Sequence, residues 1–181
     1  LSGRDTLDVP GLERLVEHLV LGGCAGIFLL GTTGEAPGLS YRLRRELIER
    51  TCRQVAGRIP VLVGVTDTAF IESVALARVA AEAGAQFVVA SAPYYFPAAQ
   101  PELCEYIGHL VAEMPLPLLL YNMPGLTKVS FEIETVRCAL DMPGVVGMKD
   151  SSGDMIYFHR LMEVARQRHD WHVLIGPEGV R

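Results

Sequence analysis

Short apolar runs alternate with longer amphipathic stretches along the whole chain. Six runs have the length and composition of β-strands, and they cover residues 26–32, 61–66, 86–92, 117–122, 145–150 and 172–176. Helices are predicted before and between them, because hydrophobic residues recur there at helical spacing, as on the face made by Leu12, Leu15, Val16, Leu19 and Val20. The pattern predicts a regular succession of strand and helix.

Short polar side chains mark the helix starts. Asp8, Ser40 and Asp154 are predicted N-caps, because their side chains can accept hydrogen bonds from the free N–H groups of a first helical turn. The predicted strand ends recur every 25 to 34 residues, about the length of one strand-helix unit. Since no linker interrupts this series, we predict one domain over residues 1–181.

Continuous apolar strands that are each followed by a helix predict an α/β fold with a parallel sheet covered by helices. An open doubly wound sheet and a (β/α)8 barrel both fit this pattern. A barrel needs eight strands and typically about 250 residues, so six strands would make an incomplete barrel. The sequence begins at a helix and stops after a strand, so a barrel reading implies that the first strand and the C-terminal units are missing from it.

Composition narrows the possible partners. The chain is 50% hydrophobic with a formal net charge of −5, and its acids and bases are mixed along the sequence. The sequence has no basic stripe of the kind that indicates nucleic acid binding. No apolar run has the roughly 18 residues that a membrane span needs. The first residues, LSGRDTLDV, lack the pattern of a signal peptide. We therefore expect a cytoplasmic protein that binds small molecules, with no nucleic acid or membrane partner.

Neither cysteines nor histidines show the spacing of a metal site. The four cysteines are far apart and form no C-x-x-C pair, and the five histidines form no H-E-x-x-H pattern. We predict that no metal is bound and that each cysteine packs as a small hydrophobic residue.

Lys149 ends the apolar run VVGMK. The chain has 16 lysines and arginines in total, and only Lys128 and Lys149 are lysines. A lysine at a strand end often only extends its amine to water. The alternative is catalytic, since a deprotonated lysine amine can attack a carbonyl carbon and form an imine, which a guanidinium cannot do at neutral pH.

Other polar residues gather at the predicted strand ends, where parallel α/β folds place their active sites. The turn GTTGE follows the first predicted strand, Tyr94 and Tyr95 follow the third, and Tyr121 ends the fourth. A tyrosine hydroxyl near Lys149 could pass protons. Backbone N–H groups of the glycine-rich turn could hold a small carboxylate, or the turn could be structural only.

Four motifs in this order and spacing, GTTGE, PYY, YNMP and GMKDSSGD, resemble the dihydrodipicolinate synthase and N-acetylneuraminate lyase family. The resemblance spans the whole chain. It implies a (β/α)8 TIM barrel, here with strands 2 to 7 only, and assembly as a homotetramer or dimer. It also implies a metal-independent enzyme that needs no cofactor, because a lysine forms a Schiff base with pyruvate or another 2-oxo acid.

The same resemblance assigns roles to single residues. Lys149 matches the imine-forming lysine and Tyr121 the tyrosine that relays protons. Thr32 and Thr33 match the pair that holds the carboxylate of the 2-oxo acid.

Three further residues match with less direct roles. Tyr95 matches a tyrosine that reaches into a neighbouring subunit's site, Gly176 matches a glycine that lines the substrate pocket, and Glu178 falls where some members bind substrate hydroxyls. A ring packed in a subunit interface remains the alternative for Tyr94, and a surface carboxylate remains the alternative for Glu178.

One segment departs from the family pattern. After YNMP, dihydrodipicolinate synthases usually carry Ser-Arg-Thr-Gly, and the arginine grips the carboxylate of the aldehyde substrate. This chain has Gly125, Leu126, Thr127 and Lys128 instead. Leu126 cannot bind a carboxylate, and the loss of a bidentate, charge-assisted contact is large enough to change substrate choice. Lys128 could supply the charge, or it could be a solvated loop residue.

We therefore interpret the chain as a class I, Schiff-base-forming lyase or aldolase that acts on a 2-oxo acid such as pyruvate, with a sugar-derived or other hydroxy-oxo acid as substrate. The first alternative is the 4-hydroxy-tetrahydrodipicolinate (dihydrodipicolinate) synthase of lysine biosynthesis, and a dehydratase that uses the same imine also fits. An alternative of another class is a catalytically silent relative or fragment that serves as a binding or assembly subunit.

Overall fold

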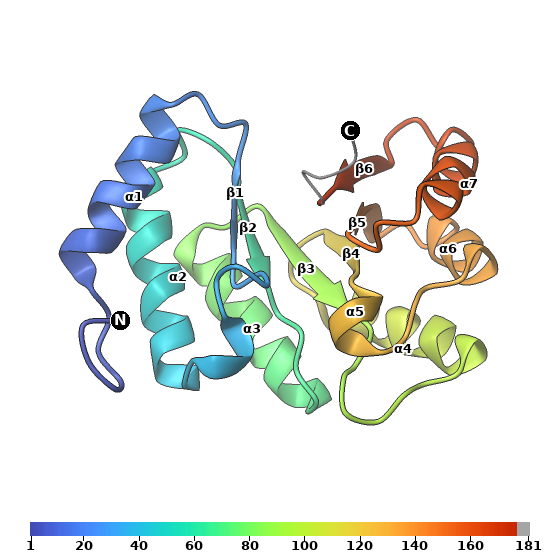
Figure 1. The fold of residues 1–181 in the computed structure, drawn as a ribbon, viewed down its shortest axis with the longest axis horizontal. Helices are drawn as coiled ribbons and strands as arrows, with labels where there is room; N and C mark the ends of the chain where they lie inside the picture. The colour runs from blue at the N-terminus through green and yellow to red at the C-terminus, as the bar shows by residue number, and fades with distance from the viewer. Residues whose placement is uncertain (177–181) are drawn as a thin grey trace.

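A computed structural model describes residues 1–176 of the chain (Figure 1). Six strands lie close to the predicted positions: β1 (Ile27–Leu29), β2 (Val61–Gly64), β3 (Phe87–Ser91), β4 (Leu118–Asn122), β5 (Val145–Asp150) and β6 (His172–Ile175). The helices are α1 (Val9–Leu21), the 3-10 turn η1 (Ala36–Gly38), α2 (Tyr41–Val55), α3 (Phe70–Ala83), α4 (Gln100–Glu113), α5 (Pro124–Thr127), α6 (Ile133–Leu140) and α7 (Met155–Ala165). The predicted succession of strand and helix is confirmed.

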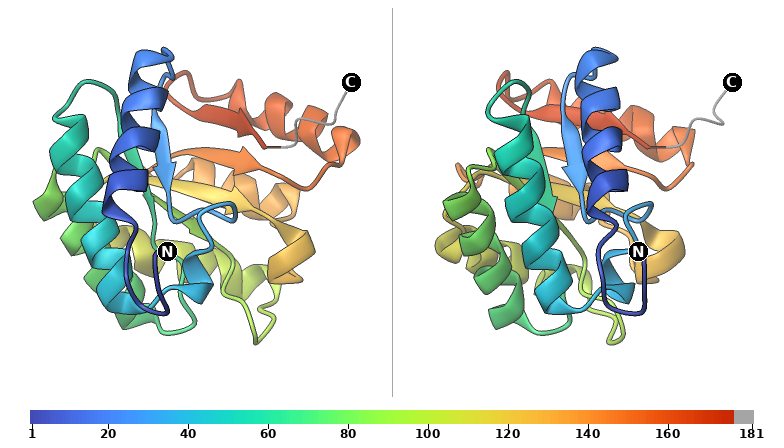
Figure 2. Two further views of the ribbon diagram at one scale, coloured as in Figure 1. Left: turned by 60° about the vertical axis from the view of Figure 1, so that its left-hand side comes forward. Right: turned by 90° about the vertical axis from the view of Figure 1, so that its left-hand side faces the viewer.

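The strands form one parallel sheet in the order β1-β2-β3-β4-β5-β6. An open doubly wound sheet reverses its strand order at a switch point, whereas here each strand pairs with its neighbours in sequence. The sheet curves, and the helices cover its outer, convex side (Figures 1 and 2). This is the arrangement of a barrel wall, so the doubly wound alternative does not apply.

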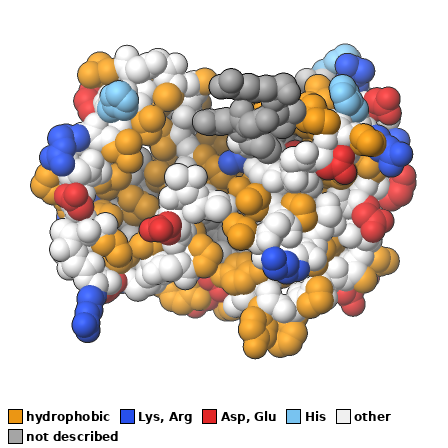
Figure 3. Space-filling view, viewed as in Figure 1, with side chains coloured by type: hydrophobic (Ala, Val, Ile, Leu, Met, Phe, Trp, Pro, Cys, Tyr) orange, Lys and Arg blue, Asp and Glu red, His pale blue; other side chains and the backbone are white. Residues whose placement is uncertain are grey.

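Two hydrophobic clusters lie on the two faces of the sheet. The larger cluster joins the helices to the convex face and includes Val63, Val88, Leu118 and Met148. The smaller cluster lies on the concave face, around Val89, Leu119 and Tyr121. Figure 3 shows hydrophobic side chains in the hollowed part of the molecule, with many charged side chains toward the edges of the view.

An irregularity in β5 decides which face Lys149 occupies. The register places Val145 opposite Leu118 but Gly147 opposite the next residue of β4, so Val146 is an extra residue in β5. In an unbroken strand, Lys149 would share a face with Val145, which is buried under the helices. The extra residue reverses the alternation and turns the Lys149 side chain to the concave face.

The three predicted N-caps are confirmed. The Asp8 carboxylate accepts a hydrogen bond from Gly11 N at 3.0 Å, and Ser40 Oγ accepts one from Leu43 N at 3.3 Å. Asp154 caps α7 by accepting from the N–H groups of residues 156 and 157. At these three helices, a side chain at the N-cap therefore fixes the loop-to-helix transition.

The prediction for the cysteines is wrong for two of them. Cys104 of α4 and Cys138 of α6 form a disulfide with their Cα atoms 6.3 Å apart, within the usual range for this bond. Sequence spacing could not show this, because the two helices become neighbours only in the folded chain. Cys52 is buried in the main cluster, as expected, and Cys24 is a half-buried free thiol.

None of the helices within residues 1–176 combines the length and the apolar character that crossing a membrane requires.

Candidate active site

Three neighbouring strands bring polar side chains to the concave face at their carboxyl ends. In the register of the sheet, Ser91 of β3 lies opposite Tyr121 of β4, and Tyr121 lies opposite Lys149 of β5. Residues that pair across parallel strands point to the same face. The three side chains therefore form a row along one edge of the sheet.

The Lys149 amine lies against two aromatic rings. Its Nζ is 4.7 Å from the centre of the Tyr121 ring and 5.0 Å from the centre of the Phe28 ring. The two rings themselves meet edge to face, with centroids 5.8 Å apart. No carboxylate within residues 1–176 forms an ion pair with this amine, and the two rings are its cation–π partners there.

Tyr121 connects the lysine to the turn after β1. Its hydroxyl lies 3.1 Å from Thr32 Oγ1, and either group can be the donor. Thr32 belongs to the GTTGE turn, which is closed by a hydrogen bond from Glu35 N to the Thr32 carbonyl at 3.0 Å. Thr32, Tyr121 and Lys149, which are far apart in sequence, therefore meet at one place. Thr33 is exposed and makes no side-chain hydrogen bond to another of the described residues.

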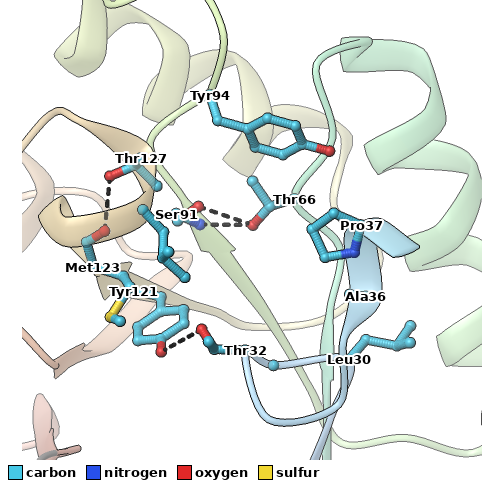
Figure 4. A pocket seen from close by; sticks show the side chains of 12 residues that line it. Leu30, Thr32, Ala36, Pro37, Thr66, Ser91, Tyr94, Tyr121, Met123 and Thr127 are labelled. Carbon is cyan, nitrogen blue, oxygen red and sulfur yellow. Dashed lines mark hydrogen bonds between the residues drawn. The ribbon is translucent and has the colours of Figure 1, made fainter. Parts of the chain in front are cut away.

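A cavity of about 270 Å³ opens next to this cluster (Figure 4). It is lined by residues at the carboxyl ends of four strands and in the segments that follow these strands: Leu30, Gly31, Thr32, Ala36, Pro37, Thr66, Ser91, Tyr94, Tyr121, Met123, Leu126 and Thr127. None of these lining side chains is charged. Lys149 is not among them, and Tyr121 is the residue that both lines the cavity and contacts the lysine amine.

Gly176 lies directly beside Lys149. A side chain at this position would collide with Ser151 Oγ, and its Cβ would lie 3.2 Å from Lys149 Cε. The Gly176 N–H donates to the Asp150 carbonyl at 2.7 Å, which holds the end of β6 against β5. Glycine is therefore required here by the space that the Ser151 and Lys149 side chains occupy. Glu178 lies outside the described residues.

The two tyrosines of the PYY motif have different surroundings. Tyr94 lines the cavity, and Figure 4 shows its ring above Thr66 and Pro37. Tyr95 is 83% exposed, with φ at +83°, and its ring meets that of Phe96 edge to face. Within a single chain, Tyr95 is not brought to Tyr121.

A buried ion pair lies behind Tyr94. Arg44 and Asp67 are joined at 3.0 Å, and Tyr41 donates a hydrogen bond to the Asp67 carboxylate. Burial acts to raise the pKa of Asp67, but hydrogen bonds from Ala69 N–H, Arg44 and Tyr41 outweigh it, so this pKa lies below its ordinary 3.8. Burial raises the pKa of the Tyr94 phenol, and the negative charge of Asp67 adds to this effect.

The segment that departs from the family pattern forms α5 at the rim of the cavity. Leu126 lines the cavity and remains 56% exposed. Lys128 is exposed and donates to the Gly125 carbonyl at 2.7 Å, so its amine is engaged within its own loop. Leu126, and not Lys128, therefore presents its side chain to the cavity.

Sequence reasoning did not select several of the cavity residues. Thr66 and Ser91 were recognisable as strand ends, and they are hydrogen bonded, with Ser91 N donating to Thr66 Oγ1 at 2.9 Å. Tyr94 and Met123 stand in the PYY and YNMP motifs, but no feature of the sequence indicated that they line a cavity, since the path of their loops is set by tertiary packing. Phe28 could have been found by alternation, because it shares the concave face with its neighbour Leu62.

No group of three or more His, Cys, Asp or Glu side chains that could hold a metal ion occurs in the described part of the chain.

Comparison with known proteins gives a consistent result. The profile of the "Dihydrodipicolinate synthetase family" matches residues 2–179. The 4-hydroxy-tetrahydrodipicolinate synthase of Bacillus subtilis is 34% identical over 180 residues, which is 99% of this chain and 61% of that protein. The enzyme of the same name from Thermus thermophilus is 39% identical, over 98% of this chain and 59% of its own length.

Solved structures agree with the fold. The dihydrodipicolinate synthase of Bacteroides thetaiotaomicron has a TM-score of 0.94 and 51% identity, over 98% of this chain and 60% of that chain. YagE, a prophage protein of the dihydrodipicolinic acid synthase family from E. coli K12 solved in complex with pyruvate, has a TM-score of 0.90 and 29% identity, over 94% and 58%. The chain thus spans about three-fifths of the length of the relatives that it matches.

Proposed function

Because this chain belongs to the dihydrodipicolinate synthetase family, we propose that it carries the Schiff-base centre of a metal-independent lyase acting on pyruvate or a similar 2-oxo acid. The observation that carries the proposal is the packing of the Lys149 amine on the Tyr121 ring, with Thr32 bound to the Tyr121 hydroxyl. This arrangement puts a nucleophile, a proton-carrying hydroxyl and a strand-end turn at one edge of the sheet.

In the proposed reaction, the Lys149 amine adds to the ketone carbon of pyruvate, and loss of water gives a protonated imine. The imine acts as an electron sink, so a proton can leave the neighbouring carbon and a new carbon-carbon bond can form there, or such a bond can break in reverse. Tyr121 relays the protons. Thr32 and Thr33, in the turn after β1, bind the carboxylate, and no added cofactor takes part.

Two interpretations of the second substrate remain, and they have different support. The names of the relatives favour a 4-hydroxy-tetrahydrodipicolinate synthase, which joins pyruvate to aspartate semialdehyde, over the aldolase interpretation. The exposed Leu126 at the cavity rim favours an aldolase with an uncharged or hydroxylated partner, because no described cavity side chain is cationic.

The proposed enzyme works as a homo-oligomer. Tyr95 and Phe96 form an exposed aromatic pair next to Tyr94, which lines the cavity. In this proposal, Tyr95 enters the site of a neighbouring copy and completes the proton relay there. Gly176 and Glu178 are proposed to line the substrate site, the latter by binding substrate hydroxyls.

Borohydride reduction in the presence of labelled pyruvate, followed by mass spectrometry of peptides, tests the Schiff base. An adduct on Lys149 is expected, and an adduct on Lys128 would contradict the assignment. A protein that forms no adduct would instead fit the silent binding or assembly subunit.

Steady-state rates with aspartate semialdehyde then separate the two enzymatic interpretations. Efficient condensation by the natural protein supports the synthase. If the protein is an aldolase, the natural protein reacts poorly, and Leu126→Arg raises kcat/KM for this substrate by about tenfold or more.

A further inference from the structure

Asn122 and Asp150 directly follow Tyr121 and Lys149 on neighbouring strands. The two residues lie opposite one another in the register, and Asn122 Nδ2 donates to Asp150 Oδ1 at 2.9 Å. Asn122 is 0% and Asp150 is 2% exposed. A fully buried side-chain hydrogen bond therefore joins β4 to β5 one residue beyond the two proposed catalytic side chains.

The side-chain oxygens of this pair also accept hydrogen bonds from the loops that follow β4 and β5. Asn122 Oδ1 accepts from Phe131 N at 3.1 Å and from Ser130 Oγ at 3.3 Å. Asp150 accepts from Ser152 N at 3.2 Å through Oδ1 and from Ser152 Oγ at 2.9 Å through Oδ2. The pair thus also fixes the starts of the loops that follow both strands.

A buried carboxylate is a costly way to join two strands. No cation within residues 1–176 pairs with Asp150, and burial of an unpaired charge is compensated here by hydrogen bonds alone. Two apolar side chains would fill this place at lower cost. The pair therefore contributes orientation, which apolar packing does not specify.

The extra residue in β5 explains why orientation matters at this point. Backbone pairing between β4 and β5 shifts by one residue at Val146. A further shift of one residue would turn Lys149 to the other face of the sheet, away from Tyr121. The bond between Asn122 and Asp150 is made in the register that places the amine 4.7 Å from the Tyr121 ring centre, and a shift of one residue would break it.

We propose that Asn122 and Asp150 form a positioning pair that sets the Lys149 amine against Tyr121 for imine formation. The proposal rests on the proposed Schiff-base function. Neither residue is proposed to contact substrate, because their side chains lie on the face of the sheet opposite to Tyr121 and Lys149. They act by fixing the positions of Tyr121 and Lys149, which directly precede them.

Exchange of the two side chains provides the test. Asn122→Asp places a second buried carboxylate next to that of Asp150 and removes the N–H donor of the bond between the two strands. The double variant Asn122→Asp with Asp150→Asn restores the bond between the strands in reverse, because the carboxylate at position 122 still accepts from Phe131 N and Ser130 Oγ while the amide at position 150 donates. The amide oxygen at position 150 still accepts from Ser152 Oγ, but the amide nitrogen replaces the oxygen that accepted from Ser152 N, so this one bond is lost. The measurement is the rate of imine trapping by borohydride at saturating pyruvate, across a range of pH and alongside thermal unfolding.

We expect Asn122→Asp to slow trapping by roughly 10- to 100-fold, as misplacement of a reacting group by about 1 Å does. The exchanged double variant should recover most of the trapping rate that the single variant loses, with a pH profile of the natural shape. Thr135→Val is the control. It removes a partly buried hydrogen bond elsewhere in the fold, from Thr135 Oγ1 to Gln100 Oε1 at 2.6 Å, and should lower the melting temperature without changing the trapping rate.

The positioning role is overturned if the folded single variant traps pyruvate at the natural rate, or if the exchanged variant melts like the natural protein but stays as slow as the single variant. Absence of any Lys149 adduct in the natural protein would instead overturn the proposed function, and the positioning role with it.

Discussion

Tyr121 is held from two directions. Its hydroxyl bonds to Thr32, its ring packs on Phe28 and the Lys149 amine, and it is 8% exposed. A side chain fixed in this way needs little rearrangement when a substrate binds, which favours proton transfer from a defined position.

Tyr121→Phe keeps the ring and removes the hydroxyl. We expect kcat for the pyruvate-dependent reaction to fall by roughly 100- to 10,000-fold with a smaller change in KM, because general acid-base catalysis contributes factors of this size. Thr32→Val, which removes only the partner hydroxyl, should have a smaller effect. Equal kcat values for Tyr121→Phe and the natural protein, in steady-state assays, would remove Tyr121 from the mechanism.

The Arg44–Asp67 pair predicts a dependence of stability on pH. The pKa of Asp67 is lowered by folding, so the pair's contribution is present above pH 3.8 and is lost as the pH falls through the lower folded pKa. Asp67→Asn should reduce the free energy of unfolding by roughly 3 kcal/mol at pH 7, because it leaves Arg44 buried without a counter-charge.

Urea unfolding at pH 7, 4 and 2.5 measures this effect. The difference between Asp67→Asn and the natural protein should shrink toward pH 2.5. Asp170→Asn, at an exposed carboxylate that pairs with Arg168, is the control and should change stability little. A constant difference at all three pH values would argue against the ion pair.

The residues most visible in the sequence were those whose chemistry is rare in their setting. A lysine behind an apolar run and a tyrosine at a strand end indicated the site, and the structure brings them together. Thr66 and Met123 line the cavity without any such signal, because only the folded path of their loops brings them to it.

Among the elements, β5 shows a limit of pattern reasoning. The run VVGMKD predicts a strand correctly, but simple alternation within it assigns Lys149 to the wrong face. The extra residue at Val146 is set by pairing with β4, and Gly147 fits because a side chain there would collide with the His172 carbonyl of β6. Neighbouring strands, and not the run itself, decide the direction of the lysine.

The disulfide between α4 and α6 gives a prediction for these two helices. Reduction, or replacement of Cys104 and Cys138 by serine, should lower the free energy of unfolding by about 2–4 kcal/mol, because the bond closes a loop with a sequence separation of 34. Chemical unfolding with and without reductant measures it. Cys24→Ser is the matched control at a free thiol. If reductant leaves the natural protein's stability unchanged, the two cysteines are thiols in solution.

The whole molecule has two strands that each pair on one side only within residues 1–176, β1 and β6. The alternation of strands and helices could be predicted, but strand order could not, because open sheets and barrels share the same alternation. The motif resemblance indicated the barrel, and the sequential order of the strands agrees with it.

Unpaired strand edges attract other strands, so we expect the 181-residue chain, when produced by itself, to self-associate. Ile175→Lys on β6, at a residue that is 48% exposed, should shift the chain toward monomer in light scattering after size-exclusion chromatography. Ile156→Lys, on α7 and 70% exposed, removes a similar apolar side chain away from the edge and should not. A monomeric natural chain at micromolar concentration would contradict this prediction.

The sequential strand order also affects how the chain can fold during synthesis. Within residues 1–176, strands pair only with their neighbours in sequence, so each strand-helix unit can dock on the unit already made as it leaves the ribosome. Contacts of this kind span short stretches of sequence, which lowers contact order and favours rapid folding. The bond between Asn122 and Asp150 needs only β4 and β5, so the register around Lys149 can be set before β6 is made.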